Sequence, residues 1–116
     1  MTVTIFHNPR CSKSRDTLSL LQEKGIAPTI VAYLEQAPSP AELKTLLTRL
    51  GFADARQLMR RNEAEYAELG LDDPALDQDA LIAAMAAHPR LIERPIVING
   101  SKAAIGRPPE NVLAIL

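Results

Sequence analysis

The fold is decided by the stretch Val3-Thr4-Ile5-Phe6-His7-Asn8-Pro9-Arg10-Cys11-Ser12-Lys13-Ser14-Arg15. Its first residues are β-branched and apolar in alternation, which is typical of a short strand. Leu18 and Leu21 lie one turn apart in the segment that follows, so a helix is predicted from about residue 11 to residue 24. Gly25 is placed to end that helix in the left-handed conformation. The only cysteine of the chain is therefore predicted at the junction of a strand and a helix.

A second strand is predicted over residues 29–34, and a helix between two strands implies a right-handed parallel crossover. The middle of the chain is predicted to be helical. Ser39 and Glu42 have capping-box spacing before a leucine stripe, and further helices are expected at about 54–59 and 77–88. The apolar faces of these helices carry Leu43, Leu46, Leu47, Leu50, Leu58, Met59, Leu81, Ile82 and Met85.

The end of the chain is predicted to form a hairpin and a helix. Asn99-Gly100 between two apolar runs is expected to turn the hairpin, with both residues at positive φ. A terminal helix is expected to begin at Pro108 and to turn Val112, Leu113 and Leu116 inward. This order predicts an α/β chain of one domain, residues 1–116: a thioredoxin-like fold with a helical insertion, whose small mixed sheet ends in a β-hairpin and C-terminal helix.

Composition excludes several classes of function. The chain has 116 residues, 47% of them hydrophobic, and a net charge of -1, so no strong field attracts nucleic acid or a membrane. A single cysteine excludes an internal disulfide and fits a reducing cytoplasm, where we expect the protein to reside. Residues 2–6 are too short for the apolar part of a signal peptide, and no apolar run approaches membrane-spanning length.

Basic residues surround the predicted position of Cys11. Arg10 precedes it, while Lys13 and Arg15 follow it in the first helical turn. Free backbone N–H groups at a helix start and nearby guanidinium groups lower a cysteine pKa, and the same groups bind anions. The pattern therefore indicates a reactive thiolate beside an oxyanion site. The alternative, an inert buried cysteine, is disfavoured by the polar and basic residues on both sides.

Cys11 and Ser14 form a C-x-x-S motif, in which serine stands where a dithiol oxidoreductase has its second cysteine. No internal thiol can then release a mixed disulfide, so a redox cycle needs an outside thiol such as glutathione or glutaredoxin. The Ser14 hydroxyl is expected to hydrogen-bond the thiolate or a bound oxyanion. His7 is expected to hydrogen-bond the loop and so support the thiolate.

Three more distant arginines are candidates for oxyanion binding: Arg60, Arg94 and Arg107. Guanidinium forks match tetrahedral oxyanions, although each of these residues taken alone is equally well an ordinary surface charge. Pro95 follows Arg94 at the place where thioredoxin-like folds have a cis proline facing the active cysteine.

Other chemistries fit the sequence poorly. A phosphatase cysteine loop has arginine six residues after the cysteine, where this chain has Thr17. One cysteine and two widely separated histidines, His7 and His88, give no metal-binding cluster, so no metal is expected. No glycine-rich nucleotide loop is present.

These residues together resemble the ArsC family of glutaredoxin-coupled arsenate reductases, and the likeness covers nearly the whole chain. The motifs that carry it are His7-Asn8-Pro9, Cys11 with Ser14-Arg15, Leu58-Met59-Arg60-Arg61-Asn62, Tyr66-Ala67-Glu68-Leu69, His88-Pro89, Glu93-Arg94-Pro95-Ile96-Val97 and Gly106-Arg107-Pro108. Arsenate reductases of this type usually have glycine directly after the cysteine. The run from Asn8 to Arg15, with Ser12 there, looks more like the YfgD-like branch.

The resemblance implies a function in arsenic detoxification: reduction of arsenate to arsenite through an adduct on Cys11. It assigns Arg60, Arg94 and Arg107 to oxyanion binding, and His7, Ser14, Arg15 and Pro95 to support of the site. Glutathione would be the co-substrate and glutaredoxin the protein partner, with no bound cofactor.

Two alternatives stay open from the sequence. Spx-like transcription factors share the fold and bind RNA polymerase, but their redox switch is a C-x-x-C motif that Ser14 breaks. A glutathione-dependent thiol transferase is also compatible with C-x-x-S, although such an enzyme does not require three oxyanion-binding arginines.

Overall fold

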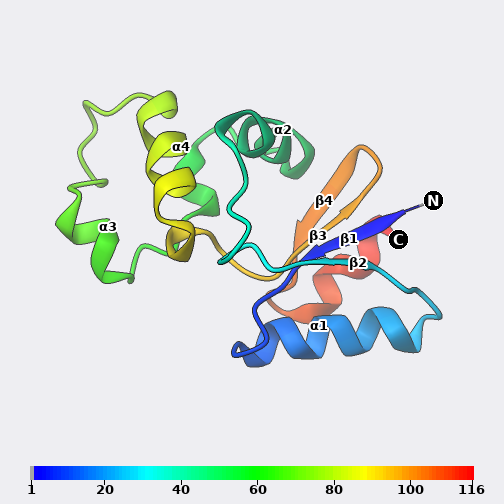
Figure 1. Ribbon diagram of the computed structural model, residues 1–116. Coiled ribbons are helices and arrows are strands. Elements are labelled where there is room, and N and C mark those ends of the chain that lie inside the picture. The colour runs from blue at the N-terminus through cyan, green and yellow to red at the C-terminus, as the bar shows by residue number, and fades with distance from the viewer. Residues whose placement is uncertain (1) are drawn as a thin grey trace. The chain divides into compact units, whose positions relative to one another are not determined.

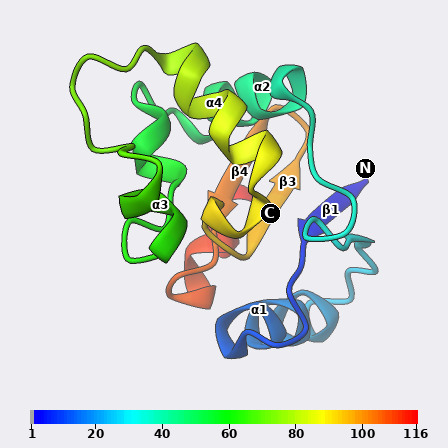
Figure 2. The same cartoon turned by 60° about the vertical axis from the view of Figure 1, so that its left-hand side comes forward.

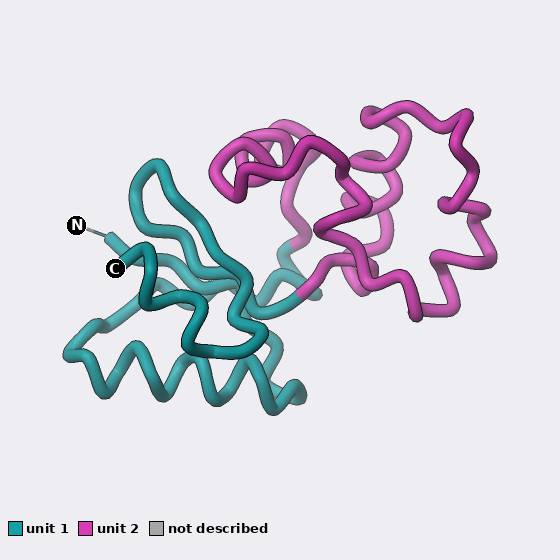
Figure 3. Tube along the Cα trace, turned by 180° about the vertical axis from the view of Figure 1, so that it is seen from behind, with its two compact units in different colours: residues 1–36, 94–116 teal, residues 37–93 magenta. Residues whose placement is uncertain are grey.

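The computed structural model describes residues 2–116 and divides them into two compact units (Figure 3). The first unit takes the described residues up to Gln36 together with Arg94–Leu116, and the second is Ala37–Glu93. Each unit is described by itself below.

A four-stranded mixed sheet organises the first unit (Figure 1). The strand order is β2-β1-β3-β4, with β1 parallel to β2 and antiparallel to β3, and with β3 antiparallel to β4. Helix α1 and the 3₁₀ helix η3 both lie along one face of this sheet in Figures 1 and 2. The predicted mixed α/β, thioredoxin-like fold is confirmed. The bounds of the elements are β1 Val3–Phe6, α1 Ser12–Glu23, β2 Thr29–Val31, β3 Ile96–Asn99, β4 Lys102–Ile105 and η3 Pro109–Ile115.

The core of the first unit lies between the sheet and α1 with η3. Strand residues alternate between faces, so Val3 and Ile5 point to the same side as Val97, the partner of Ile5 across the β1–β3 ladder. These side chains meet Leu21 of α1 and Val112 of η3 in one buried cluster. Burial of this cluster fixes α1, and therefore the residues that begin it, against the end of β1.

The second unit is helical, and its helix ends follow the capping signals of the sequence. Ser39 and Glu42 form the predicted reciprocal capping box, with side chain-to-backbone distances of 3.2 and 3.1 Å, and Gly51 ends the same helix at φ 74°. Helix α4 packs against α2 and against both short 3₁₀ helices. The bounds are α2 Pro40–Leu50, η1 Ala55–Leu58, α3 Ala64–Glu68, α4 Gln78–Ala87 and η2 Pro89–Leu91.

The apolar stripes expected for the second unit are buried, apart from Leu50, which is half-buried. Helix α3 was not anticipated from the sequence, because five residues are too few to show a helical period.

The hairpin turn differs from its prediction by one residue. Asn99 pairs with Lys102, so the two central residues of the turn are Gly100 and Ser101 rather than Asn99 and Gly100. Only Gly100 has positive φ, at 62°, which is the pattern of a turn with glycine at its first central position. Asn99 instead ends β3, and its side-chain amide donates a hydrogen bond of 2.7 Å to the Ile115 carbonyl.

The C-terminal helix forms as a 3₁₀ helix, and this changes which residues it buries. Side chains three residues apart align in a 3₁₀ helix, so Val112 and Ile115 turn toward the core. Leu113 and Leu116, which were predicted to point inward, are 39% and 42% exposed.

The second predicted strand is also shorter than expected. Strand β2 ends at Val31, because the chain turns there with hydrogen bonds from Tyr33 N–H to the Val31 carbonyl and from Glu35 N–H to the Ala32 carbonyl.

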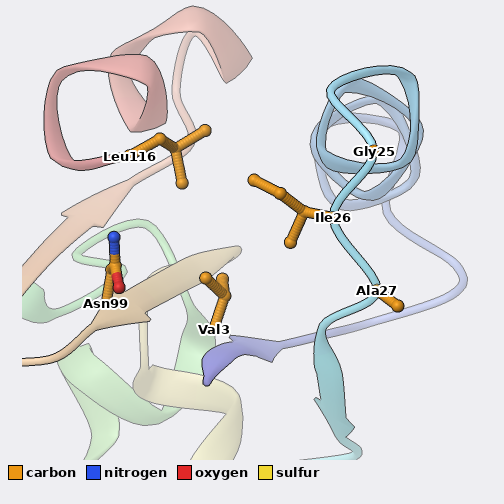
Figure 4. Close-up of a pocket in the computed structure, with 6 residues that line it drawn as sticks. All are labelled: Val3, Gly25, Ile26, Ala27, Asn99 and Leu116. Atoms are coloured by element: carbon orange, nitrogen blue, oxygen red, sulfur yellow. The ribbon is translucent and has the colours of Figure 1, made fainter. Parts of the chain in front are cut away.

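A hollow of about 350 Å³ lies in the first unit, at the end of α1 away from Cys11 (Figure 4). In Figure 4 the Ile26 side chain extends toward Val3 and Leu116, and Asn99 lies at the same hollow. The residues that line it carry no charge and no nucleophile: Val3, Gly25, Ile26, Ala27, Asn99 and Leu116. The chemistry indicated by the sequence therefore belongs elsewhere.

We expect Leu21→Ala to lower the free energy of unfolding by about 2–5 kcal/mol, because the Leu21 side chain is fully buried in the cluster under the sheet. Leu113→Ala is the matched control, and its exposed side chain predicts a loss below about 1 kcal/mol. Urea unfolding of both variants measures the difference, and equal losses would contradict this description of the core.

Candidate functional site

Cys11 lies at the end of the loop that connects β1 to α1. A backbone hydrogen bond within this loop fixes its conformation. The Cys11 N–H donates to the Asn8 carbonyl at 3.0 Å, which folds the loop into a turn. Cys11 is then the N-cap residue of α1, in extended conformation at φ -98° and ψ 123°. The first N–H groups of a helix have no partner within it, so they are free to face an anion here.

The pKa of the Cys11 thiol is set by opposing influences. Burial raises the pKa, because it disfavours the charged form. The backbone N–H of Ser14, the positive charge of Arg94 and the backbone N–H of Lys13 lower it, and a hydrogen bond from the Arg94 side chain adds to them. The lowering influences prevail, so the pKa of Cys11 lies below that of an ordinary cysteine. The predicted shift toward thiolate is thus supported by named groups.

The hairpin brings Arg94 and Arg107 together. Ile96 pairs with Ile105 in the β3–β4 ladder, so the residue before β3 and the residue after β4 must be neighbours. The Arg107 Nη1 donates to the Arg94 carbonyl at 3.3 Å and approaches the Cys11 Sγ to 3.9 Å. Both arginines therefore lie at the thiol, and their role in binding an oxyanion stays a prediction.

The same corner carries two cis peptide bonds, Arg94–Pro95 and Arg107–Pro108. The first is the cis proline that the fold predicted; the second was not anticipated.

A close packing of three residues attaches this corner to α1. Gly106 is buried and its N–H donates to the Pro95 carbonyl at 2.9 Å. Its carbonyl lies 3.5 Å from the Thr17 hydroxyl, whose shorter hydrogen bond, 2.8 Å, goes to the Lys13 carbonyl. A methyl group on Gly106 would stand 2.9 Å from the Pro95 Cγ and would also overlap Thr17. From the sequence, Thr17 was considered only because it stands where a phosphatase cysteine loop has arginine. Its position in the sequence gives no sign of its contact with Gly106, 89 residues away.

Ser14 is fully buried, and its hydroxyl faces the loop rather than the thiol. It accepts a hydrogen bond from the Asn8 N–H at 3.0 Å and lies 2.6 Å from the His7 Nδ1. Burial and the nearby Arg15 lower the pKa of His7, which favours the neutral form of its ring. Ser14 therefore serves the thiolate through its backbone N–H, whereas its hydroxyl and His7 stabilise the loop.

Arg15 and Arg10 have different surroundings. The Arg15 Nη1 donates to the Pro9 carbonyl at 2.9 Å, which fixes the loop from the helix side. The Arg10 backbone N–H donates to the Asn8 Oδ1 at 3.0 Å, while its side chain extends into solvent.

Arg60 belongs to the second unit, and its assignment to the oxyanion site stays a prediction. Its backbone is fixed by a hydrogen bond of 2.7 Å to the Leu91 carbonyl, beside the Met59–Ile92 bridge. The Arg60 Nη2 forms an ion pair of 3.2 Å with Glu63, whose carboxylate also pairs with Arg90 at 2.9 Å. Arg60 is half-buried and fixed by these contacts, whereas Arg61 is exposed.

Within residues 2–116, no cluster of three or more histidine, cysteine or acidic residues is placed to hold a metal ion. No helix in the described part of the chain is long and apolar enough to cross a membrane.

The arrangement in the first unit combines a nucleophile with anion-binding groups. A thiolate at a helix start, flanked by Arg94 and Arg107, can attack the central atom of an oxyanion whose oxygens the guanidinium groups hold. Residues 6–115 match the ArsC family. The chain belongs to the ArsC family.

Three relatives match the chain over nearly their whole lengths. The chain is 57% identical to a protein of Neisseria meningitidis serogroup A named arsenate reductase, over 98% of this chain and 97% of that protein. It is 55% identical to the Escherichia coli K12 protein YfgD, which is described as uncharacterized, over 98% of this chain and 96% of YfgD. The solved structure of an arsenate reductase from Vibrio cholerae is 57% identical and superimposes with a TM-score of 0.98, covering 100% of this chain and 98% of that one. The predicted ArsC membership is confirmed.

We expect Arg94→Gln to raise the pKa of the Cys11 thiol, because it removes both a positive charge and a hydrogen bond that favour the thiolate. The pH dependence of Cys11 alkylation by iodoacetamide measures this change. Arg10→Gln is the control, since Arg10 is adjacent in sequence but is not among the groups that lower this pKa. An unchanged profile for Arg94→Gln would remove Arg94 from the site.

Proposed function

We propose that this protein reduces arsenate to arsenite, with Cys11 as the nucleophile and external thiols as the reductant. The observation that carries the proposal is the Cys11 thiol, its pKa lowered, beside Arg94 and Arg107 in an ArsC chain. The names of relatives more than half identical to it supply the substrate.

The first step is attack of the Cys11 sulfur on arsenic. A sulfur–arsenic bond forms, one arsenate oxygen takes up a proton, and it leaves as water. Charge builds on the remaining oxygens, where Arg94 and Arg107 donate hydrogen bonds that strengthen in the transition state. Arg60 is the third arginine of this proposal, and its fork can hold a further oxygen.

Electrons then come from two external thiols. Arsenic(V) gains two electrons and becomes arsenic(III), while two thiols lose two electrons and two protons and become a disulfide. Because Cys11 is the only cysteine and the fourth position of its motif is Ser14, the protein cannot supply the second sulfur. We propose that the glutathione sulfur bonds to the arsenic of the adduct with loss of a second water, and that a glutaredoxin thiolate then attacks this sulfur, which gives the glutathione–glutaredoxin mixed disulfide and leaves the electron pair on arsenic. Water then hydrolyses the remaining bond between Cys11 and arsenic(III), which releases arsenite and restores the Cys11 thiolate.

The direct test is an arsenate reduction assay with glutathione and glutaredoxin. We expect turnover with the native protein and none above background with Cys11→Ser, because a serine hydroxyl stays protonated where the thiolate forms. Circular dichroism of the variant checks that its fold is kept. Equal turnover by the two proteins would eliminate the mechanism.

A second test addresses Arg60. We expect Arg60→Lys to lower kcat/KM for arsenate at least about tenfold, because a single ammonium cannot replace a guanidinium fork at an oxyanion. Arg61→Lys is the matched control, one residue away and exposed, and we expect it to keep its activity within about twofold. Equal effects of the two substitutions would exclude Arg60 from the reaction.

A further inference from the structure

A second hollow of the first unit opens directly beside the nucleophile loop. Its volume is about 290 Å³, close to the lower limit of about 300 Å³ for small-molecule sites. One wall is the loop that leads to Cys11, and the other is the turn after β2. Its lining residues are His7, Asn8, Pro9, Arg10, Ala32, Leu34 and Glu35.

Both walls of this hollow are fixed by hydrogen bonds and packing. The His7 N–H donates to the Val31 carbonyl at 2.9 Å, which continues the parallel pairing of β1 and β2 into the two walls. On the far wall, Tyr33 is buried and its ring stacks on Phe6, with centroids 6.4 Å apart. The hollow is therefore preformed.

Because Tyr33 is buried, the two residues that follow it, Leu34 and Glu35, face solvent. Leu34 is 39% exposed, and Glu35 is exposed as well. On the near wall Arg10 is exposed while its backbone is held by Asn8. Among residues 2–116, neither the Arg10 guanidinium nor the Glu35 carboxylate has a hydrogen-bond or ion-pair partner. One unpaired cation and one unpaired anion thus line the same hollow, with an apolar side chain beside them.

This combination fits a ligand that carries both charges. Arsenate is a small anion, which Glu35 would repel, so the hollow does not suit the oxyanion. Glutathione has two carboxylates, one ammonium group and a thiol on a chain of about three residues, which spans roughly 10 Å when extended. Because Arg10 directly precedes Cys11, a peptide bound at Arg10 has its thiol within reach of the nucleophile.

We propose that the hollow between Arg10 and Glu35 binds the peptide part of glutathione, an inference that rests on the thiol-dependent half of the proposed function. Arg10 pairs with a glutathione carboxylate, Glu35 pairs with the ammonium group, and Leu34 contacts the methylene groups between them.

The test uses disulfide exchange without arsenate, so that it does not depend on the oxyanion chemistry. The Cys11 thiolate attacks one sulfur of oxidised glutathione, one glutathione leaves as a thiolate, and the other stays on Cys11 as a mixed disulfide. Mass spectrometry measures the rate of this modification. The uncharged 2-hydroxyethyl disulfide reports on the reactivity of Cys11 alone.

We expect Arg10→Gln and Glu35→Gln each to slow the reaction with oxidised glutathione about two- to fivefold, the upper range for one exposed charge pair, and to leave the rate with the neutral disulfide within about 1.5-fold. Glu35→Gln is the more informative variant, because it separates a specific contact from a general effect of charge. Oxidised glutathione is a net anion, so removal of a negative charge without a specific contact would speed the reaction, whereas loss of the ammonium partner slows it.

Lys24→Gln and Glu23→Gln are the charge-matched controls, because they lie at the far end of α1, about 18 Å from Cys11 along a twelve-residue helix. Faster exchange in Glu35→Gln, or equal slowing with both disulfides, would overturn the proposal. If the exchange rate depends on these charges in a protein that does not turn over arsenate, the glutathione site is supported and only the assignment of arsenate as substrate is contradicted.

Discussion

The structure around Cys11 depends on one balance: burial raises the pKa of the thiol, whereas backbone N–H groups and a guanidinium lower it further than burial raises it. The N–H groups come from the start of α1, and the guanidinium belongs to Arg94 at the entrance of the hairpin. Neither source is close to the other in the sequence. The cluster beneath the sheet and the contact of Thr17 with Gly106 keep the helix and the hairpin in register. Small errors in this packing would move a charge away from the thiolate.

Much of this site could be predicted from the sequence, because Cys11 and the residues that position it follow one another in the chain. The strand, turn and helix from Val3 to Glu23 follow from alternation, capping and helical spacing, so the position of Cys11 at a helix start could be deduced. The neighbourhood of Arg94 and Arg107 follows from antiparallel pairing once the hairpin is recognised. The motifs shared with the ArsC family named the same arginines independently.

The rest depends on geometry that residue types leave undetermined. A one-residue shift of the turn moved Asn99 from the turn into β3, where it binds the Ile115 carbonyl. A 3₁₀ period in place of an α period exchanged Leu113 for Ile115 in the core. The Ser14 hydroxyl was expected at the thiolate, but burial directs it to Asn8 and His7. In each case local spacing allowed two arrangements, and tertiary contacts selected one.

The central claim is that an oxyanion binds against a Cys11 thiolate, and protection of that thiolate tests it most directly. The rate of Cys11 alkylation by iodoacetamide is measured at neutral pH as arsenate is added without any thiol reductant. The account predicts fast alkylation in the absence of arsenate, because the pKa of Cys11 is lowered, and saturable protection as arsenate fills the site. Alkylation at the rate of an ordinary cysteine, unaffected by arsenate, would contradict it.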